Sequence, residues 1–357
     1  TRLQVEHPVT EMITGEDLVA WQLAVAAGEP LSKAQGHITR HGHAMEVRLY
    51  AENPEQGFLP SSGLLSHLRW PHEVARVDAG YENGDRVDDH YDPMIAKLIC
   101  HGASRNEARQ KLITALEALE LTGIHHNAPF LHRVLNDDAF VGGELDTRLL
   151  EHRPQLLEAT GTDPALLALA ASQVFAANNA SSSPWQSLQG WRPLGRRFRQ
   201  TLLQVDGDLV TVREQDGCAA VGDQQAPLSA TLTDHDITLH WGNLGLRARH
   251  ARKGDHTLLL FVAGQAHAVT LNPSRESARH DEEAGFIAPM SGTIVALHVS
   301  AGDTVAAGDA VITLEAMKME HTLRATVPGT VHDFHVAAGD SVSEGTLLVE
   351  FEETADD

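Results

Sequence analysis

The sequence predicts a multidomain α+β protein with a β-rich middle part and an all-β C-terminal part. Its 357 residues are enough for two or three domains. Up to about residue 150, strand and helix patterns come in blocks, without the regular alternation that builds a parallel sheet. Further along, the pattern changes to short strands with close turns, and the C-terminal segment contains an internal repeat.

The composition limits the expected partners and compartment. A net charge of −22 argues against nucleic acid or an anionic membrane as the main partner. Cys100 and Cys218 lie far apart and indicate no disulfide framework, which favours a reducing, cytoplasmic compartment, or the mitochondrial matrix if the source is eukaryotic. The sequence starts without Met and without a lead-in, so we expect it to be the C-terminal part of a longer polypeptide.

Four elements are predicted in residues 1–150. A capping box at 14–17 starts a helix that ends at Gly28. Alternation at 43–51 predicts a half-buried strand, Ser104 caps a second helix, and the Asn-Ala-Pro sequence at 127 opens a third. Spacing assigns the faces: Leu18, Trp21 and Val25 on the first helix; Met45, Val47 and Leu49 opposite Glu46, Arg48 and Tyr50 on the strand; Ala108, Leu112, Ala115 and Leu119 on the second helix.

Two predicted linkers delimit the middle of the chain. Residues 151–190 comprise an Ala- and Leu-rich helix and a polar Asn/Ser linker. Residues 191–272 alternate in short strands and predict an antiparallel barrel or sandwich. The charged segment 273–284 is the second linker, and it leads into a repeat module at 285–353.

The repeat module consists of two copies of one segment. Each copy is too small to be stable alone, so we expect the two to interlock around a shared core and a pseudo-two-fold axis near residue 320. The axis places the linking turn beside Lys318. Gly292, Gly302, Asp303, Val305 and Gly308 recur as Gly329, Gly339, Asp340, Val342 and Gly345, each at the same interval (329 − 292 = 345 − 308 = 37).

Lys318 is the last lysine of the chain and the first after Lys253. Its simplest interpretation is an ordinary surface lysine. However, Met317 and Met319 flank it, and an exposed turn has no folding reason to use methionine. Exposed methionines on both sides indicate a surface that an apolar pocket of another protein recognises.

The segment Glu315-Ala-Met-Lys-Met-Glu320 resembles the biotin attachment motif of biotin-dependent carboxylases, and residues 285–353 resemble their all-β biotinyl/lipoyl-type domain, a flattened barrel of two interlocked repeats. The resemblance implies that Lys318 carries covalent biotin and that biotin protein ligase recognises Met317 and Met319. The related lipoyl domains are the alternative, but they usually have Asp before and Ala after the lysine.

The opening residues suggest a second site. Arg2, Gln4 and Glu6 share one face if the stretch is extended. A cation, an amide and a carboxylate together could bind a small anion and remove a proton from it. Alternating polar residues are more often a solvated strand face, and the residue pattern alone leaves both interpretations open.

The same stretch resembles the active site of biotin carboxylase, an ATP-grasp enzyme. The resemblance implies that Arg2, Gln4 and the Val5 backbone bind bicarbonate and that Glu6 is its general base. It also implies that Arg48 stabilises negative charge on the biotin ureido oxygen. The resemblance extends over 1–150, the expected C-terminal part of such a domain, through the motifs at 1–11, 43–52, 58–63 and 91–99.

The sequence also departs from this family. The family's glycine-rich phosphate loop, nucleotide-binding lysines and first metal-binding glutamate precede the opening motif and are absent from this sequence. We therefore expect no metal ligands here, and no ATP hydrolysis by this chain alone, although the full-length subunit would use ATP, Mg2+ and bicarbonate. The 22 histidines show no convincing metal-ligand spacing.

Together these motifs resemble the biotin-containing α subunits of acyl-CoA carboxylases. The resemblance implies a hetero-oligomer with a carboxyltransferase β subunit, which 191–272 would contact and which would bind the acyl-CoA. Glu144-Leu-Asp-Thr147, Pro184-Trp185 and Gly190-Trp191 favour the 3-methylcrotonyl-CoA branch. The propionyl-, geranyl- and acetyl-CoA branches stay open, as does a non-catalytic biotin carrier.

Overall fold

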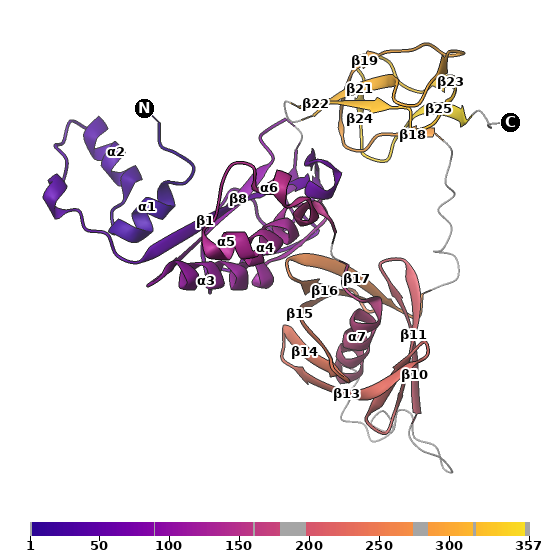
Figure 1. The fold of residues 1–357 in the computed structure, drawn as a ribbon, viewed down its shortest axis with the longest axis horizontal. Coiled ribbons are helices and arrows are strands. Elements are labelled where there is room, and N and C mark those ends of the chain that lie inside the picture. Colours follow the sequence, from indigo (N-terminus) through magenta and orange to yellow (C-terminus); the bar gives the residue numbers. More distant parts are fainter. Residues whose placement is uncertain are drawn as a thin grey trace.

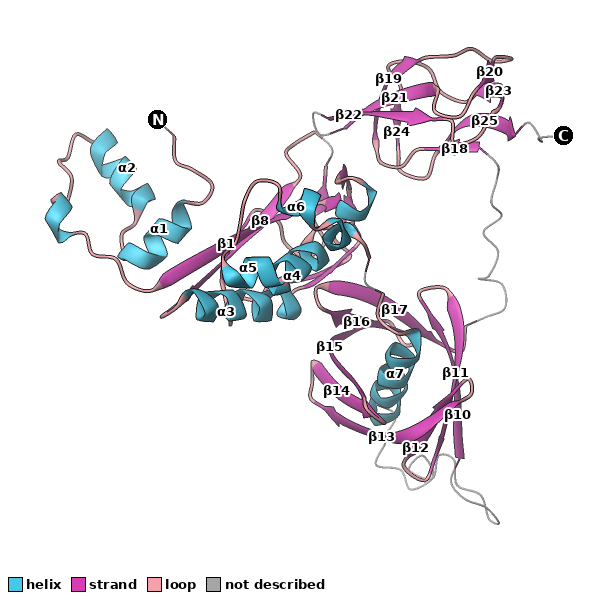
Figure 2. Ribbon diagram, viewed as in Figure 1, coloured by secondary structure: helices cyan, strands magenta, loops and turns pink. Residues whose placement is uncertain are grey.

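The computed structural model describes residues 2–88, 90–159, 161–178, 198–273, 285–316 and 319–353. Figures 1 and 2 show three regions: an α+β part, a β-barrel around one helix, and the two-sheet repeat module. No helix among these residues is long and apolar enough to cross a membrane.

The α+β part contains a three-stranded antiparallel sheet in the order β1-β8-β6, formed by His43–Tyr50, Met94–Gly102 and Arg76–Ala79. Its smaller strands form pairs: β2 (Glu52–Asn53) with β3 (Leu59–Pro60), β4 (Gly63–Leu64) with β7 (Arg86–Val87), and β5 (His67–Arg69) with β9 (Glu120–Thr122). The helices are α1 (His7–Thr14), α2 (Leu18–Ala26), α3 (Arg105–Ala118), α4 (Ala128–Asn136), α5 (Asp138–Gly142) and α6 (Leu149–His152), with 3-10 turns at Gln35–His37, Pro54–Gln56 and Pro154–Leu157.

The predicted helices and the predicted strand of this part are present, but the capping box predicted at 14–17 is wrong, because Thr14 ends α1 and Asp17 is the N-cap of α2. Strand β1 buries Val47 and Leu49, and α3 starts at Ser104, whose side chain accepts the Glu107 N–H. Asp17 caps α2 by accepting the Ala20 N–H. The condition of an extended stretch is not met at residues 5–6, because Val5 and Glu6 form a turn and α1 starts at His7 with Pro8 in its first turn.

The barrel closes eight antiparallel strands, β10 to β17, around α7 (Pro164–Asn178). Helix α7 is apolar on nearly every side, and a helix of this kind is stable in water only when it is surrounded. Its leucines and most of its alanines belong to the core of the barrel, so this helix and the strands form one packed unit. The strands are Phe198–Val205, Asp208–Gln215, Cys218–Val221, Gln224–Leu232, Asp236–Trp241, Leu244–Lys253, Thr257–Val262 and Gln265–Leu271.

The repeat module confirms the interlocked fold. One sheet has the order β18-β25-β23-β20 and the other β22-β21-β19-β24. Replacing each strand by its repeat equivalent converts one order into the other, and the short strands β20 and β24 each join the sheet of the opposite copy. The strands are β18 (Gly285–Ile287), β19 (Gly292–Leu297), β20 (Thr304–Val305), β21 (Ala310–Ala316), β22 (Met319–Arg324), β23 (Gly329–Phe334), β24 (Ser341–Val342) and β25 (Leu347–Glu353).

Equivalent hydrogen bonds connect the two copies. The Gly302 N–H donates to the Val331 carbonyl at 2.7 Å, and the Gly339 N–H donates to the Ile294 carbonyl at 2.7 Å. Both glycines have φ values near the left-handed region, 91° and 95°, which residues with a side chain rarely adopt. The repeated glycines are thus explained by the turns that carry each copy into the other.

Candidate functional site

One face of the sheet β1-β8-β6 is charged. The strand register places Arg48 opposite Lys97, and Lys97 opposite Asp78. In the next row, Ile99 lies between Glu46 and Arg76. Opposed residues of neighbouring strands share a face, so these charges gather on one side. The intervening residues, among them Val47, Leu49 and Leu98, are buried in the core on the other side.

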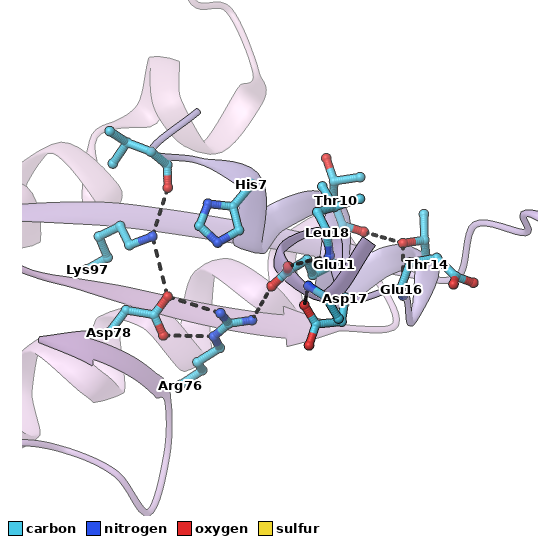
Figure 3. Close-up of polar contacts among 12 residues, drawn as sticks. His7, Thr10, Glu11, Thr14, Glu16, Asp17, Leu18, Arg76, Asp78 and Lys97 are labelled. Atoms are coloured by element: carbon cyan, nitrogen blue, oxygen red, sulfur yellow. Dashed lines mark hydrogen bonds and ion pairs between the residues drawn. The ribbon is translucent and has the colours of Figure 1, made fainter. Parts of the chain in front are cut away.

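Helix α1 and the turn before it lie over this charged face and contact all three strands. Arg48 Nη2 donates to Glu6 Oε2 at 3.0 Å. The Lys97 ammonium donates to the Val5 carbonyl at 2.9 Å. Arg76 Nη1 donates to Glu11 Oε2 at 2.7 Å, and Figure 3 shows the contacts of Lys97 and Arg76 side by side. Three strands thus hold one turn and one helix by one polar contact each.

Glu6 and Arg48 are 42 positions apart in sequence, yet they form an ion pair at the surface. Their side chains are 53% and 41% exposed, so both are accessible to a small solute. Hydrogen bonding to Tyr50 and to Glu6 raises the pKa of Arg48, whose guanidinium therefore stays charged. Although Glu6 stands at the N-cap of α1, its side chain makes no cap hydrogen bond and is directed to Arg48 instead.

Arg2, Gln4 and Glu6 line one open cavity of about 760 Å3. Leu18 and Trp21 of α2 also line this cavity. The structure therefore brings three of the predicted site residues to one cavity, and Arg48 contacts one of these three, Glu6. A cation, an amide and a carboxylate in one cavity can hold a small anion and accept its proton.

Sequence reasoning assigned no role to Lys97, Arg76, Asp78 or Glu11. Lys97 could have been noticed, because it is the one charged residue in the otherwise apolar run Met94-Ile-Ala-Lys-Leu-Ile-Cys100, and a buried charge needs a partner. The acids and Arg76 carry no comparable signal. Glu46 is also part of this face, and burial raises its pKa against the opposing effects of Lys97 and Arg48.

The second predicted site is on the repeat module. Strands β21 and β22 are antiparallel neighbours, and Ala316 is paired with Met319. Met317 and Lys318 lie outside the described residues, as does the side chain of Met319. The hydroxyls of Thr313 and Thr322 are 2.8 Å apart across the two strands. The two ends of the predicted biotin attachment motif, 315–316 and 319–320, therefore lie in neighbouring antiparallel strands and are paired with each other.

The next feature is the arrangement of side chains that could bind a metal ion. Within the described ranges, no group of three or more His, Cys, Asp or Glu side chains could hold a metal ion. No step is therefore assigned to Mg2+ on these residues.

Four protein families match successive parts of the chain. Residues 1–34 match the ATP-binding domain of the carbamoyl-phosphate synthase L chain, and 46–152 match the biotin carboxylase C-terminal domain. Residues 162–274 match the BT domain of the methylcrotonyl-CoA carboxylase α subunit. Residues 284–351 match the family described as biotin-requiring enzyme.

Curated relatives extend over these matches together. The chain is 36% identical to the mitochondrial methylcrotonoyl-CoA carboxylase subunit α of Mus musculus, with 100% of this chain and 53% of that protein covered. It belongs to the family of biotin-containing α subunits of acyl-CoA carboxylases. This α-subunit chain is also 34% identical to the propionyl-CoA carboxylase α chain of Ruegeria pomeroyi, covering 91% of the chain and 54% of the relative. It spans about half the length of the curated relatives it matches.

Among solved structures, the α-subunit chain is similar to the biotin carboxylase domain of the Hydrogenobacter thermophilus 2-oxoglutarate carboxylase. The two are 39% identical over 45% of this chain and 36% of that chain, with a TM-score of 0.44. That structure contains MgADP, ADP and bicarbonate.

The comparisons also bear on the compartment. The mouse relative of this α subunit is described as mitochondrial. This description does not support the cytoplasmic compartment that the two cysteines favour.

Proposed function

We propose that this chain forms part of a biotin-dependent acyl-CoA carboxylase, with half of a biotin carboxylation site at Glu6 and Arg48 and a biotin carrier at Lys318. The observation that carries the proposal is the Glu6–Arg48 ion pair beside the cavity that Arg2 and Gln4 line. The match of residues 284–351 to biotin-requiring enzymes supports the carrier.

In the proposed reaction, each residue of the site has one task. The Arg2 guanidinium and the Gln4 amide bind bicarbonate, together with the Val5 backbone, because an anion is best held by fixed charged donors. Glu6 takes the proton of bicarbonate while a bicarbonate oxygen attacks the γ-phosphate of ATP; ADP leaves and carboxyphosphate forms. Arg48 stabilises the negative charge that would develop on the ureido oxygen of biotin. Biotin, when bound, would supply the ureido nitrogen that accepts the carboxyl group of carboxyphosphate, with the leaving phosphate taking the proton of that nitrogen.

The acyl-CoA that we propose is 3-methylcrotonyl-CoA. The match of 162–274 to the methylcrotonyl-CoA carboxylase BT domain, which includes α7 and the barrel, supports this substrate. In this proposal the barrel contacts a carboxyltransferase β subunit, which binds the acyl-CoA, and the mitochondrial matrix is the compartment in a eukaryotic source. The similarity to a propionyl-CoA carboxylase α chain makes propionyl-CoA the second candidate.

Two measurements test this function. Streptavidin blotting and intact mass should show one biotinyl group on the wild-type chain after exposure to biotin protein ligase, and none on Lys318→Ala. The control Lys253→Ala should stay biotinylated. A lipoyl group in place of biotin, or label retained in Lys318→Ala, would contradict the carrier assignment.

The second measurement assays the intact enzyme, with its β subunit, against 3-methylcrotonyl-, propionyl-, geranyl- and acetyl-CoA. We expect the highest kcat/KM for 3-methylcrotonyl-CoA. A higher kcat/KM for another acyl-CoA would identify that compound as the substrate instead. The 357-residue chain alone should not hydrolyse ATP. Bicarbonate-dependent ATP hydrolysis by that chain would show that it needs no further nucleotide-binding residues.

A further inference from the structure

Lys97 is a buried cation directly beneath the Val5–Glu6 turn. It is 8% exposed and lies in the central strand of the sheet β1-β8-β6. A buried ammonium is costly unless charged or polar partners surround it. Lys97 has two such partners: Nζ donates to the Val5 carbonyl at 2.9 Å and lies 3.4 Å from Asp78 Oδ2.

A continuous series of polar contacts holds Asp78, the acidic partner of Lys97, in place (Figure 3). The two carboxylate oxygens of Asp78 accept Arg76 Nε at 2.9 Å and Nη2 at 3.1 Å. Arg76 also donates to Glu11, whose second oxygen accepts the Leu18 N–H at 2.9 Å. The series therefore runs from the first residue of α2, through α1 and β6, to the ammonium of Lys97.

Among the polar contacts that Arg48, Lys97 and Arg76 make with the segment that holds Glu6, only that of Lys97 reaches the backbone of the turn. Arg76 holds the body of α1 at Glu11, and Arg48 binds the Glu6 carboxylate itself. The Val5 carbonyl belongs to the planar peptide unit that includes the Glu6 N and Cα atoms. Fixing this carbonyl therefore limits the direction in which the Glu6 side chain leaves the backbone.

We propose that Lys97 is a positioning residue for the bicarbonate reaction: it holds the Val5–Glu6 turn so that Glu6 faces the cavity. This inference rests on the proposed function. A shift of the turn by about 1 Å would misplace the base, and displacements of this size reduce rates by about a hundredfold. Lys97 does not touch the reacting atoms itself.

The test uses Lys97→Met in the intact enzyme, because methionine fills a similar volume without the ammonium. We expect kcat/KM for bicarbonate to fall about tenfold to a hundredfold, while KM for ATP changes by less than about twofold. Lys97→Arg retains a cation and hydrogen-bond donors, and it should recover most of the loss. It also tests the proposal if Lys97→Met fails to fold.

Arg109→Met is the matched control. Arg109 is 6% exposed, and its Nη1 donates to the Leu135 carbonyl at 2.8 Å, so it is another buried cation on a backbone carbonyl. It lies in α3, outside the charged face, and its loss should lower the unfolding midpoint without changing the bicarbonate kinetics. Equal losses of kcat/KM for bicarbonate in Lys97→Met and Arg109→Met, or no loss in Lys97→Met, would overturn the proposal.

Hydrogen exchange separates this inference from the proposed function, because it needs no activity. The His7 and Val9 N–H groups donate to the Gln4 and Glu6 carbonyls, both at 3.1 Å. Lys97→Met should accelerate exchange of these two amides, and Arg109→Met should not. If the wild-type enzyme shows no bicarbonate-dependent ATP hydrolysis, the proposed function fails. Unchanged exchange in Lys97→Met, with an active wild type, instead removes the positioning role.

Discussion

The repeat module and the charged face beneath α1 differ in how far apart in the sequence their contacting residues lie. In the repeat module, strands β21 and β22 follow each other directly, and the two copies meet through a fixed interval. On the charged face, Val5 contacts Lys97 at a separation of 92 positions, and Glu11 contacts Arg76 at a separation of 65. The first arrangement leaves a trace in the sequence as a repeat, whereas the second leaves only isolated charges.

The same contrast holds for the kind of interaction. The core of the repeat module is made of small and branched apolar residues, with glycines where strands approach closely. The charged face depends instead on ionic groups, and the burial of Lys97 and Glu11 is tolerated because each has a polar partner. Substitutions in the repeat module should therefore destabilise it through steric clashes. Substitutions on the charged face should instead act through the loss of a charge or of the geometry that the charge maintains.

The largest effect is expected from Glu6→Gln in the intact enzyme. It removes the proposed base while keeping the shape of the side chain, so bicarbonate-dependent ATP hydrolysis should fall about 10²- to 10⁴-fold. The folded state should change little, because Glu6 is exposed and makes no cap hydrogen bond. Steady-state kinetics and an unfolding curve measure both. Glu29→Gln, on an exposed residue, is the control, and full activity of Glu6→Gln would remove Glu6 as the base.

A pair of glycine substitutions sharpens the comparison within the repeat module. A Cβ at Gly329 would collide with the Phe351 ring and lie 2.5 Å from the Glu352 carbonyl oxygen, so Gly329→Ala should cost about 2–4 kcal/mol. A Cβ added at Gly339 would meet no other atom within 4 Å, so Gly339→Ala should cost only the strain of its positive φ, about 1 kcal/mol. Chemical unfolding followed by a probe in this module measures the difference. Equal losses would show that close packing does not explain Gly329.

The smallest effect concerns the pH dependence of the α+β part. Burial, followed by Asn127 and Asp92 with opposing effects, raises the pKa of Glu52 from 4.5 to about 6. The folded state binds the Glu52 proton more tightly than the unfolded state does. The contribution of this proton to the free energy of unfolding is therefore fully present below pH 4.5 and is lost as the pH rises through 6. Glu52→Gln should therefore be about 1 kcal/mol more stable than the wild type at pH 7.5 and nearly equal to it at pH 4.5. A stability difference that does not vary over this interval would contradict the raised pKa.

Much of the fold follows from patterns within single segments. The alternation at 43–51 and the cap at Ser104 predict β1 and α3, and the repeat predicts the two interlocked sheets. These signals are readable because the residues that create them are close in sequence or recur at a constant interval. The position of α7 inside the barrel is harder to predict. An all-apolar helix must be surrounded, but its sequence does not say by which strands.

For the site, the sequence determined the chemical types: a cation, an amide and a carboxylate in the opening motif, Arg48 on the charged side of a strand, and one lysine between two methionines. Only the tertiary structure decided which of them meet. It ended the opening stretch in a turn at Glu6, placed that turn over Lys97, and paired Glu6 with Arg48. The physical reason is that an ion pair depends on distance in space, and strand register together with the packing of α1 sets that distance.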